Sequence, residues 1–106
     1  MTIQPLISIV TPSFNSQRTI ARTIESVLLQ TYENIEYVIV DGGSADSTVD
    51  IIKKYASKYP KKLLWISEKD QGMYDAINKG ISRSNGELIG ILNSDDWYEP
   101  DAVESM

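Results

Sequence analysis

The chain has 106 residues, of which 42% are hydrophobic and 24% charged, and its formal net charge is -5. This length and composition predict a single soluble globular domain. Histidine and cysteine are absent, which excludes His-based zinc sites, His general bases, Ser-His triads and thiolate chemistry within the chain. The negative net charge argues against nucleic acid as the main partner. Chemistry must therefore depend on carboxylates, Lys, Arg, hydroxyls and a hard metal ion.

The sequence contains no segment that predicts export or a membrane span. No apolar stretch approaches the roughly 20 residues that a spanning helix needs, and the first residues lack the layout of a signal peptide. We therefore expect a cytoplasmic location, with membrane association left open for a longer protein.

Apolar runs and helical spacing alternate along the chain. Apolar, largely β-branched runs predict strands over residues 6–11, 35–40, 63–67 and 87–92. Apolar residues at helical spacing predict helices over 17–30, from Ser47 to just before Pro60, and from just after Gly72. Pro100 suits the first turn of a fourth helix.

Two of the predicted helices have interpretable details. Ser47 is the expected N-cap of the second helix, with Asp50 three residues later in a weak form of the capping box. For the third helix, the expected inner face is Met73, Ile77 and Ile81, while the small residues Ala76 and Gly80 permit close packing.

This alternation predicts an α/β fold: a Rossmann-like parallel sheet of about four strands with helices on both faces. Ligands bind such sheets at the carboxyl ends of the strands. Three polar clusters fall at those ends, at residues 11–15, 41–46 and 93–96. We therefore expect them to lie along one edge and to form a binding site.

The cluster Asn93-Ser94-Asp95-Asp96 follows the apolar run Leu88–Leu92, which is typical of a buried strand. Adjacent carboxylates at such a position repel each other, and a divalent cation between them relieves this repulsion. The alternative is a solvated turn in which Asp95 or Asp96 begins the next helix. The coincidence with the other two clusters favours the metal site.

The remaining candidates each have two interpretations. Asp41, at the end of the second predicted strand, can accept hydrogen bonds from a base or a ribose, or can belong to a simple turn with Gly42 and Gly43. The first strand lacks a following G-x-G-x-x-G turn, which argues against NAD or FAD. Phe14 can stack on a base or cover the first helix. Gly72 can receive an anion at a helix N-terminus or serve backbone geometry alone.

In their order and spacing, four segments resemble the family 2 glycosyltransferases, whose catalytic domain has the GT-A fold. These segments are residues 8–15, 41–48, 72–80 and 86–96. The resemblance runs nearly end to end, and it implies an enzyme that transfers a sugar from a nucleotide-diphosphate sugar to an acceptor hydroxyl, with a UDP-sugar as the preferred donor.

The resemblance also implies roles for individual residues. Thr11, Pro12, Phe14 and Asn15 would line the nucleotide pocket, with Phe14 near the base, and Asp41 would bind the base. Asn93-Ser94-Asp95 would occupy the family's Asp-x-Asp motif. Asp95, with Asp96 as a second candidate, would hold Mn²⁺ or Mg²⁺ against the two phosphates. The chain departs from the usual motif because its first residue is Asn93, which brings no charge.

Family members invert the anomeric centre with a carboxylate base that lies well after the metal motif, in the acceptor-binding half. We therefore expect residues 1–106 to be the donor-binding half, able to bind donor but not to transfer sugar at a useful rate. The acceptor of the full-length enzyme would be a glycan or lipid-linked glycan, as in cell-surface polysaccharide biosynthesis.

Cutting the fold here would leave residues 88–92 as an exposed apolar edge, through which we expect self-association. One competing interpretation is an inactive nucleotide-binding or self-associating module. A receiver-like phosphotransfer domain is disfavoured, because such domains place carboxylates after the first strand and this chain has Thr11-Pro12 there.

Overall fold

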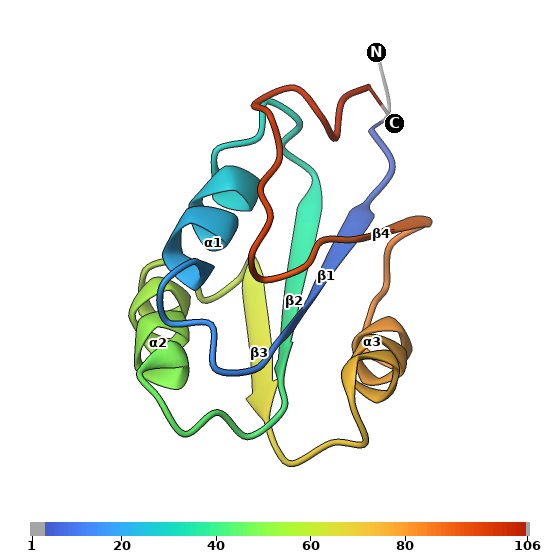
Figure 1. Cartoon of the computed structure of the whole chain (residues 1–106). Coiled ribbons are helices and arrows are strands. Elements are labelled where there is room, and N and C mark those ends of the chain that lie inside the picture. Colours follow the sequence, from blue (N-terminus) through green and yellow to red (C-terminus); the bar gives the residue numbers. More distant parts are fainter. Residues whose placement is uncertain (1–3, 106) are drawn as a thin grey trace.

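The computed structural model describes residues 4–105 and contains one parallel sheet of four strands in the order β3-β2-β1-β4 (Figure 1). The strands are β1 (Ile7–Ser13), β2 (Ile35–Asp41), β3 (Leu63–Ser67) and β4 (Leu88–Ile91). Every neighbouring pair is parallel. The chain order reverses between β1 and β4, so the carboxyl ends of β1 and β4 form the expected ligand crevice. The predicted fold class is confirmed.

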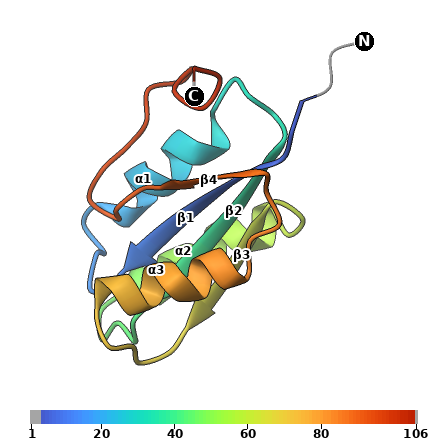
Figure 2. The same cartoon turned by 90° about the vertical axis from the view of Figure 1, so that its right-hand side faces the viewer.

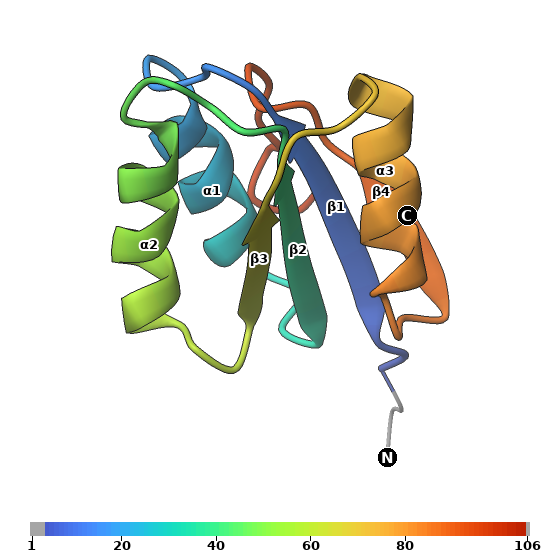
Figure 3. The same ribbon diagram turned by 90° about the horizontal axis from the view of Figure 1, so that it is seen from below.

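Helices cover both faces of the sheet. Helices α1 (Ile20–Leu28) and α2 (Thr48–Lys58) lie on one face, and α3 (Met73–Ser82) lies on the other (Figure 3). In the part of the chain that the structure describes, no helix is long and apolar enough to cross a membrane.

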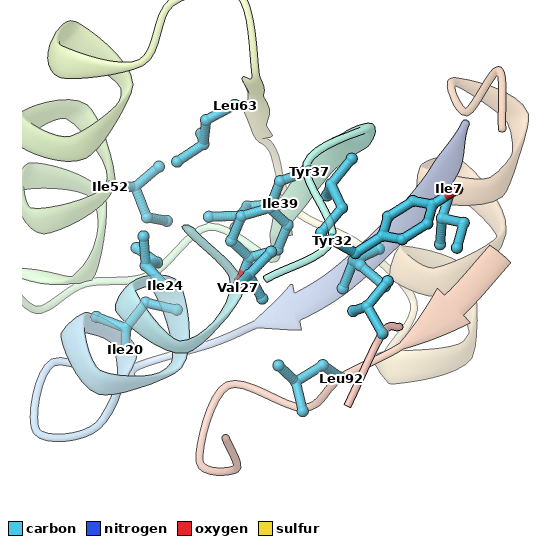
Figure 4. Close-up of a cluster of buried hydrophobic side chains, with 13 residues drawn as sticks. Ile7, Ile20, Ile24, Val27, Tyr32, Tyr37, Ile39, Ile52, Leu63 and Leu92 are labelled. Atoms are coloured by element: carbon cyan, nitrogen blue, oxygen red, sulfur yellow. The ribbon is translucent and has the colours of Figure 1, made fainter. Parts of the chain in front are cut away.

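The central strands β1 and β2 alternate between two cores. Side chains such as Ile9, Tyr37 and Ile39 point toward α1 and α2, where they meet the apolar residues of those helices (Figure 4). The residues between them, such as Val10 and Val38, point toward α3. This period of two places apolar residues on both faces, as expected for strands buried on both sides.

Helix α2 begins where predicted but with a different cap. Ser47 occupies the N-cap position, yet its side chain makes no capping hydrogen bond. Instead, the Asp46 carboxylate accepts the Thr48 N–H at 2.9 Å. Ser47 is therefore the N-cap residue as predicted, but the predicted capping hydrogen bond is not formed: Asp46 accepts the first N–H of the helix, whereas the Ser47 hydroxyl would cap the second or third.

The predicted inner face of α3 is wrong in part. Met73 and Ile81 are exposed, whereas Ala76 and Gly80 are buried against the sheet. A Cβ at Gly80 would lie 2.3 Å from Val10 Cγ1. The helix therefore lies so close to β1 that small residues form its contact face, and the larger apolar side chains are displaced to its flanks.

Strand β4 is shorter than the strand predicted over residues 87–92, and it forms the exposed apolar edge expected of this chain rather than a buried strand. It spans Leu88–Ile91 at the edge of the sheet, and Leu88, Ile89 and Ile91 are all exposed. Only Leu92, just after the strand, is buried. The predicted burial required neighbours on both sides, and in the described chain β4 pairs with β1 alone.

Within residues 4–105, no fourth helix follows β4. Residues 100–105 form consecutive turns. A helix would pair the Val103 N–H with the Glu99 carbonyl, but the Gln30 side chain takes both: its Oε1 accepts from Val103 at 2.9 Å and its Nε2 donates to Glu99 at 2.6 Å. The segment is therefore docked on α1, as the chain path after β4 shows (Figures 1 and 2), and Val103 joins the larger core.

Candidate functional site

A cavity of about 840 Å³ lies at the carboxyl ends of the strands. Segments from all three predicted polar clusters line it, together with the stretch before α3. The lining comprises residues 12–19, Gly42, Asp46, Lys69, Asp70, Gly72, Met73, Ala76 and residues 93–95. The structure thus brings together Pro12, Phe14, Asn15, Gly72, Asn93, Ser94 and Asp95 of the predicted site, while Thr11, Asp41 and Asp96 do not line the cavity.

Thr11 belongs to the core rather than to the cavity wall. It is fully buried, and its hydroxyl shares a 2.8 Å hydrogen bond with the Tyr37 hydroxyl. Burial raises the pKa of Tyr37, so this phenol remains protonated and satisfied within the core.

The loop between β1 and α1 forms one wall of the cavity. Phe14 projects from it with 61% of its surface exposed, so the alternative in which Phe14 covers the first helix is wrong. Asn15, at φ 48°, fixes the loop against the one after β2: its N–H donates to Ser44 Oγ at 2.8 Å, and its Oδ1 accepts the Ala45 N–H at 2.9 Å.

The Asp41 carboxylate is fully buried beneath the loops. Oδ1 accepts from the hydroxyls of Ser13 and Ser44, and Oδ2 accepts from the Ser67 hydroxyl and from the N–H groups of Gly43 and Ser44. Burial alone would raise the pKa of Asp41, but these hydrogen bonds outweigh it and hold the pKa below its ordinary value. Asp41 is therefore an ionised anchor for the ends of three strands.

A second carboxylate, which sequence reasoning missed as a site residue, lines the cavity above Asp41. A Cβ at Gly42 would lie 2.7 Å from Oδ2 of Asp70, so the absence of a side chain at Gly42 leaves room for Asp70. Oδ1 of Asp70 accepts the Gly72 N–H at 2.9 Å, and Gly72 has φ 112°. Gly72 thus has the conformation that favours glycine, and its N–H is already paired.

Asp95 and Asp96 have different surroundings despite their adjacency. Asp95 lines the cavity with Asn93 and Ser94. Asp96 lies outside it, and its Oδ1 accepts the Trp97 N–H at 3.0 Å. Within residues 4–105, no group of three or more acidic, His or Cys side chains could hold a metal. This donor set fits a hard cation held by one carboxylate together with phosphate oxygens of a ligand, and it does not fit a metal site built from protein alone.

Charges of both signs surround the cavity. Arg18 and Lys69 line it alongside the carboxylates of Asp46, Asp70 and Asp95. A hydrogen bond from the Thr48 hydroxyl lowers the pKa of Asp46, which keeps this carboxylate ionised. Sequence reasoning missed Arg18 and Lys69, although their positions just after β1 and β3 were a signal. Such a cavity can receive an anionic ligand whose charge is shared between basic side chains and a cation.

Comparison with known proteins identifies the relatives of this chain. It is 40% identical over 102 residues to the putative glycosyltransferase EpsH of Bacillus subtilis, covering 96% of this chain and 29% of that protein. It is 41% identical over 100 residues to the chondroitin synthase of Escherichia coli, covering 94% of this chain and 14% of that protein. The chain therefore spans less than a third of the length of these relatives.

Solved structures share the fold. The mannosyltransferase PcManGT of Pyrobaculum calidifontis, in complex with GDP-Man and Mn²⁺, matches with a TM-score of 0.84 at 25% identity, over 92% of this chain and 29% of that one. Residues 1–349 of TarS from S. aureus, in complex with UDP-GlcNAc, match with a TM-score of 0.86 at 25% identity, over 94% and 29%. The α/β fold described above is thus the partial GT-A fold that the resemblance implies.

The match to the family extends over nearly the whole chain. The sequence model of the family described as "Glycosyl transferase family 2" matches residues 8–106. This range includes every residue that lines the cavity. The chain therefore belongs to glycosyl transferase family 2.

Proposed function

We propose that this chain is the donor-binding half of a glycosyltransferase and that a nucleotide-diphosphate sugar, preferably a UDP-sugar, binds in the cavity. The observation that carries the proposal is the carboxylate of Asp95, beside Asn93 and Ser94, lining a cavity of nucleotide size at the carboxyl ends of the strands. Relatives with this fold have been solved with UDP-GlcNAc and with GDP-Man, which supports this class of ligand.

The cavity offers different chemistry to each part of such a donor. Exposed Phe14 provides a face on which a base can stack, and Asp70 provides a carboxylate that can accept a base N–H. We assign the base contact to Asp70 rather than to Asp41, because hydrogen bonds within the protein already occupy both oxygens of Asp41. Asp41 would act by holding the loops that carry Pro12 to Asn15.

The diphosphate would lie between the basic side chains and Asp95. Arg18 and Lys69 can neutralise phosphate oxygens directly. Mn²⁺ or Mg²⁺, held by Asp95 and the phosphates, would supply Lewis-acid stabilisation of the charge that develops on the leaving diphosphate. Asn93 can donate a hydrogen bond to the ribose without adding charge, so metal affinity would depend on Asp95.

The reaction proposed for the full-length enzyme inverts the anomeric centre. The acceptor hydroxyl oxygen bonds to the anomeric carbon as the bond to the diphosphate breaks, and a carboxylate base takes the hydroxyl proton. We place this base, and the site for a glycan or lipid-linked glycan acceptor, in sequence that the relatives have beyond the matched region. The isolated chain would bind donor without transferring sugar, and measurable transfer by it would contradict this assignment.

Calorimetric titration of UDP, with and without Mn²⁺, tests the donor site. We expect Mn²⁺-dependent binding that Asp95→Asn weakens by about tenfold or more, since a metal-ligating carboxylate is lost. Asp96→Asn is a matched control: it removes the same charge one residue away, outside the cavity. Binding indifferent to Asp95→Asn would refute the assignment, and a loss confined to Asp96→Asn would move the metal to Asp96.

A second candidate function, a self-associating nucleotide-binding module without activity, is favoured by one observation. Strand β4 has an open edge in the described chain and exposes Leu88, Ile89 and Ile91. Such an edge is a template for pairing with another chain. The self-association that we propose for the isolated chain would use this edge.

A further inference from the structure

A line of polar side chains runs along α1 and its flanks and faces the segment that follows β4. Its members, which we call the α1 polar stripe, are Ser16, Thr19, Thr23, Ser26 and Gln30. Their spacing of three and four residues places them on one side of the helix. Each of them hydrogen-bonds to a residue between 94 and 103. Residues 94–103 form no regular helix or strand, and the side chains of the stripe supply hydrogen bonds that secondary structure would otherwise provide.

The beginning of the stripe binds the carbonyls of the two residues that flank Asp95. Thr19 Oγ1 donates to the Ser94 carbonyl at 2.7 Å. Thr23 Oγ1 lies 2.6 Å from the Asp96 carbonyl and 2.9 Å from the Ser94 carbonyl. A hydroxyl has one proton to donate. Because the Ser94 carbonyl already accepts a hydrogen bond from Thr19, we assign the hydroxyl proton of Thr23 to the Asp96 carbonyl.

The end of the stripe holds the chain farther from the cavity. Ser26 Oγ accepts the Tyr98 N–H at 3.1 Å and donates to the Thr23 carbonyl at 2.7 Å. Gln30 pairs with Glu99 and Val103. These contacts are of the same kind as those near Asp95, but neither Ser26 nor Gln30 lines the cavity. The two ends can therefore be tested separately.

The contacts near Asp95 also explain why the two adjacent carboxylates differ. With the carbonyls of residues 94 and 96 both turned toward α1, the Asp95 side chain is left on the cavity side, while Asp96 lies outside it. Thr23 is fully buried, so water cannot replace its hydroxyl freely. The orientation of Asp95 thus depends on a hydroxyl that is distant in sequence.

We propose that Thr23 is a positioning residue for Asp95: its hydroxyl, assisted by Thr19, fixes the 94–96 loop on α1 and so sets the carboxylate that faces the cavity. This inference rests on the proposed function for the role of Asp95 as a metal ligand. It extends that function by naming Thr23, which lies outside the cavity lining, as a residue that determines metal affinity through Asp95. Residues that orient a metal ligand commonly change metal affinity by about 10- to 100-fold when replaced.

The test compares Thr23→Val, which keeps the shape and removes the hydroxyl, with Thr23→Ser, which restores it, and with Ser26→Ala as the control at the far end. Two readouts are needed: amide hydrogen exchange over residues 93–98 without ligand, and the Mn²⁺ concentration that supports UDP binding. We expect Thr23→Val to speed exchange and to raise the Mn²⁺ requirement by about tenfold, with metal-free UDP binding unchanged. Thr23→Ser should restore both.

Each outcome bears on the proposal. Unchanged exchange in Thr23→Val would overturn it, as would Ser26→Ala shifting the Mn²⁺ requirement equally, because the stripe would then only stabilise the fold. If the parent chain shows no Mn²⁺-dependent binding, the proposed function fails, and the ligand-free exchange data alone decide whether Thr23 holds the loop. Should Thr23→Val not fold, Thr19→Val, at a half-buried position, removes the 2.7 Å bond to Ser94 instead. Because Thr19 lines the cavity, this variant is judged by the ligand-free hydrogen exchange alone, and unchanged exchange would overturn the proposal.

Discussion

The two faces of the sheet are built differently. On the face of α1 and α2, 13 buried side chains form the larger core, which also takes in Leu92 and Val103 from the segment after β4. On the face of α3, four buried residues form the smaller core, and the contact depends on Ala76 and on the missing side chain of Gly80. Apolar burial, and with it most of the stabilisation, is thus concentrated on one side.

This difference coincides with a division of roles around the cavity. The face with the larger core holds the loop of Asp95, through α1 and its polar stripe. The face with the smaller core contributes Met73 and Ala76 of α3 to the cavity lining. The Asp95 side of the cavity is thus fixed by the larger core, whereas the opposite wall is formed by a helix that packs on the smaller core.

Truncating neighbouring residues of β2 that point to opposite faces should give the largest contrast. Ile39 faces the larger core and Val38 the smaller, and both are almost fully buried. We expect Ile39→Ala to lower the free energy of unfolding by about 4 kcal/mol and Val38→Ala by about 1.5 kcal/mol, because a cavity in the larger core stays open, whereas α3 can settle onto the smaller core. Urea denaturation followed by circular dichroism measures both. Equal losses per deleted carbon atom would show that the two cores are packed alike.

Asp41 connects the strand ends on the larger-core side, and its replacement should have the next largest effect. We expect Asp41→Asn to lower the free energy of unfolding by about 2–3 kcal/mol at pH 7. The substitution removes charge-assisted hydrogen bonds and places an amide NH₂ group beside groups that are themselves hydrogen-bond donors. Ser44→Ala, which removes only one of the donors, is the control and should lose less.

The same residue gives the protein a pH dependence of known sign. The pKa of Asp41 is lower in the folded chain than its ordinary value of 3.8. As the pH falls below that value, the unfolded chain binds the proton first, so the stabilisation present at neutral pH is lost on acidification. The difference in stability between the parent chain and Asp41→Asn should therefore shrink between pH 5 and the acid limit of folding. A difference that stays constant over that range would contradict the pKa shift.

Prediction from the sequence was most successful for features that depend on residues close together in the chain. The runs of β-branched residues located β2 and β3 almost to the residue, and the alternation of strands and helices predicted the sheet and its ligand edge. Because the carboxyl ends of parallel strands share one edge, segments of three separate polar clusters could be expected to meet around one cavity.

Prediction from the sequence failed where the position of a residue depends on contacts with residues distant in the chain. Asp95 and Asp96 are adjacent, yet only Asp95 lines the cavity, and the carbonyls on either side of it are bound by Thr19 and Thr23, which are distant in sequence. Asp70 enters the cavity because Gly42 lacks a side chain, and the predicted fourth helix is absent because Gln30 takes its first donor and acceptor. None of these contacts follows from periodicity or propensity.

On the smaller-core side, the close approach of α3 can be broken by one methyl group. Gly80→Ala should lower the free energy of unfolding by about 1–2 kcal/mol, because the new Cβ would lie 2.3 Å from Val10 Cγ1 and overpacking outweighs the gain in helix propensity. The double variant Val10→Ala/Gly80→Ala removes the clash and should be more stable than the sum of the single effects predicts. Additive effects would mean that α3 shifts outward freely.

The smallest effect on stability is expected at β4, where the apolar side chains are already exposed. Ile89→Lys should lower the free energy of unfolding by no more than about 1 kcal/mol, because 41% of Ile89 is already exposed and the Lys stem can cover part of the same surface. Its effect on association should be large, because a charge on an open edge opposes pairing with a second chain.

Sedimentation velocity over a range of concentrations separates the effect on stability from the effect on association. The control is Leu64→Lys, at an exposed position on the opposite edge strand β3. If the parent chain stays monomeric at high concentration, the edge does not drive association. If both lysine variants abolish association equally, added charge explains the result and β4 has no special role.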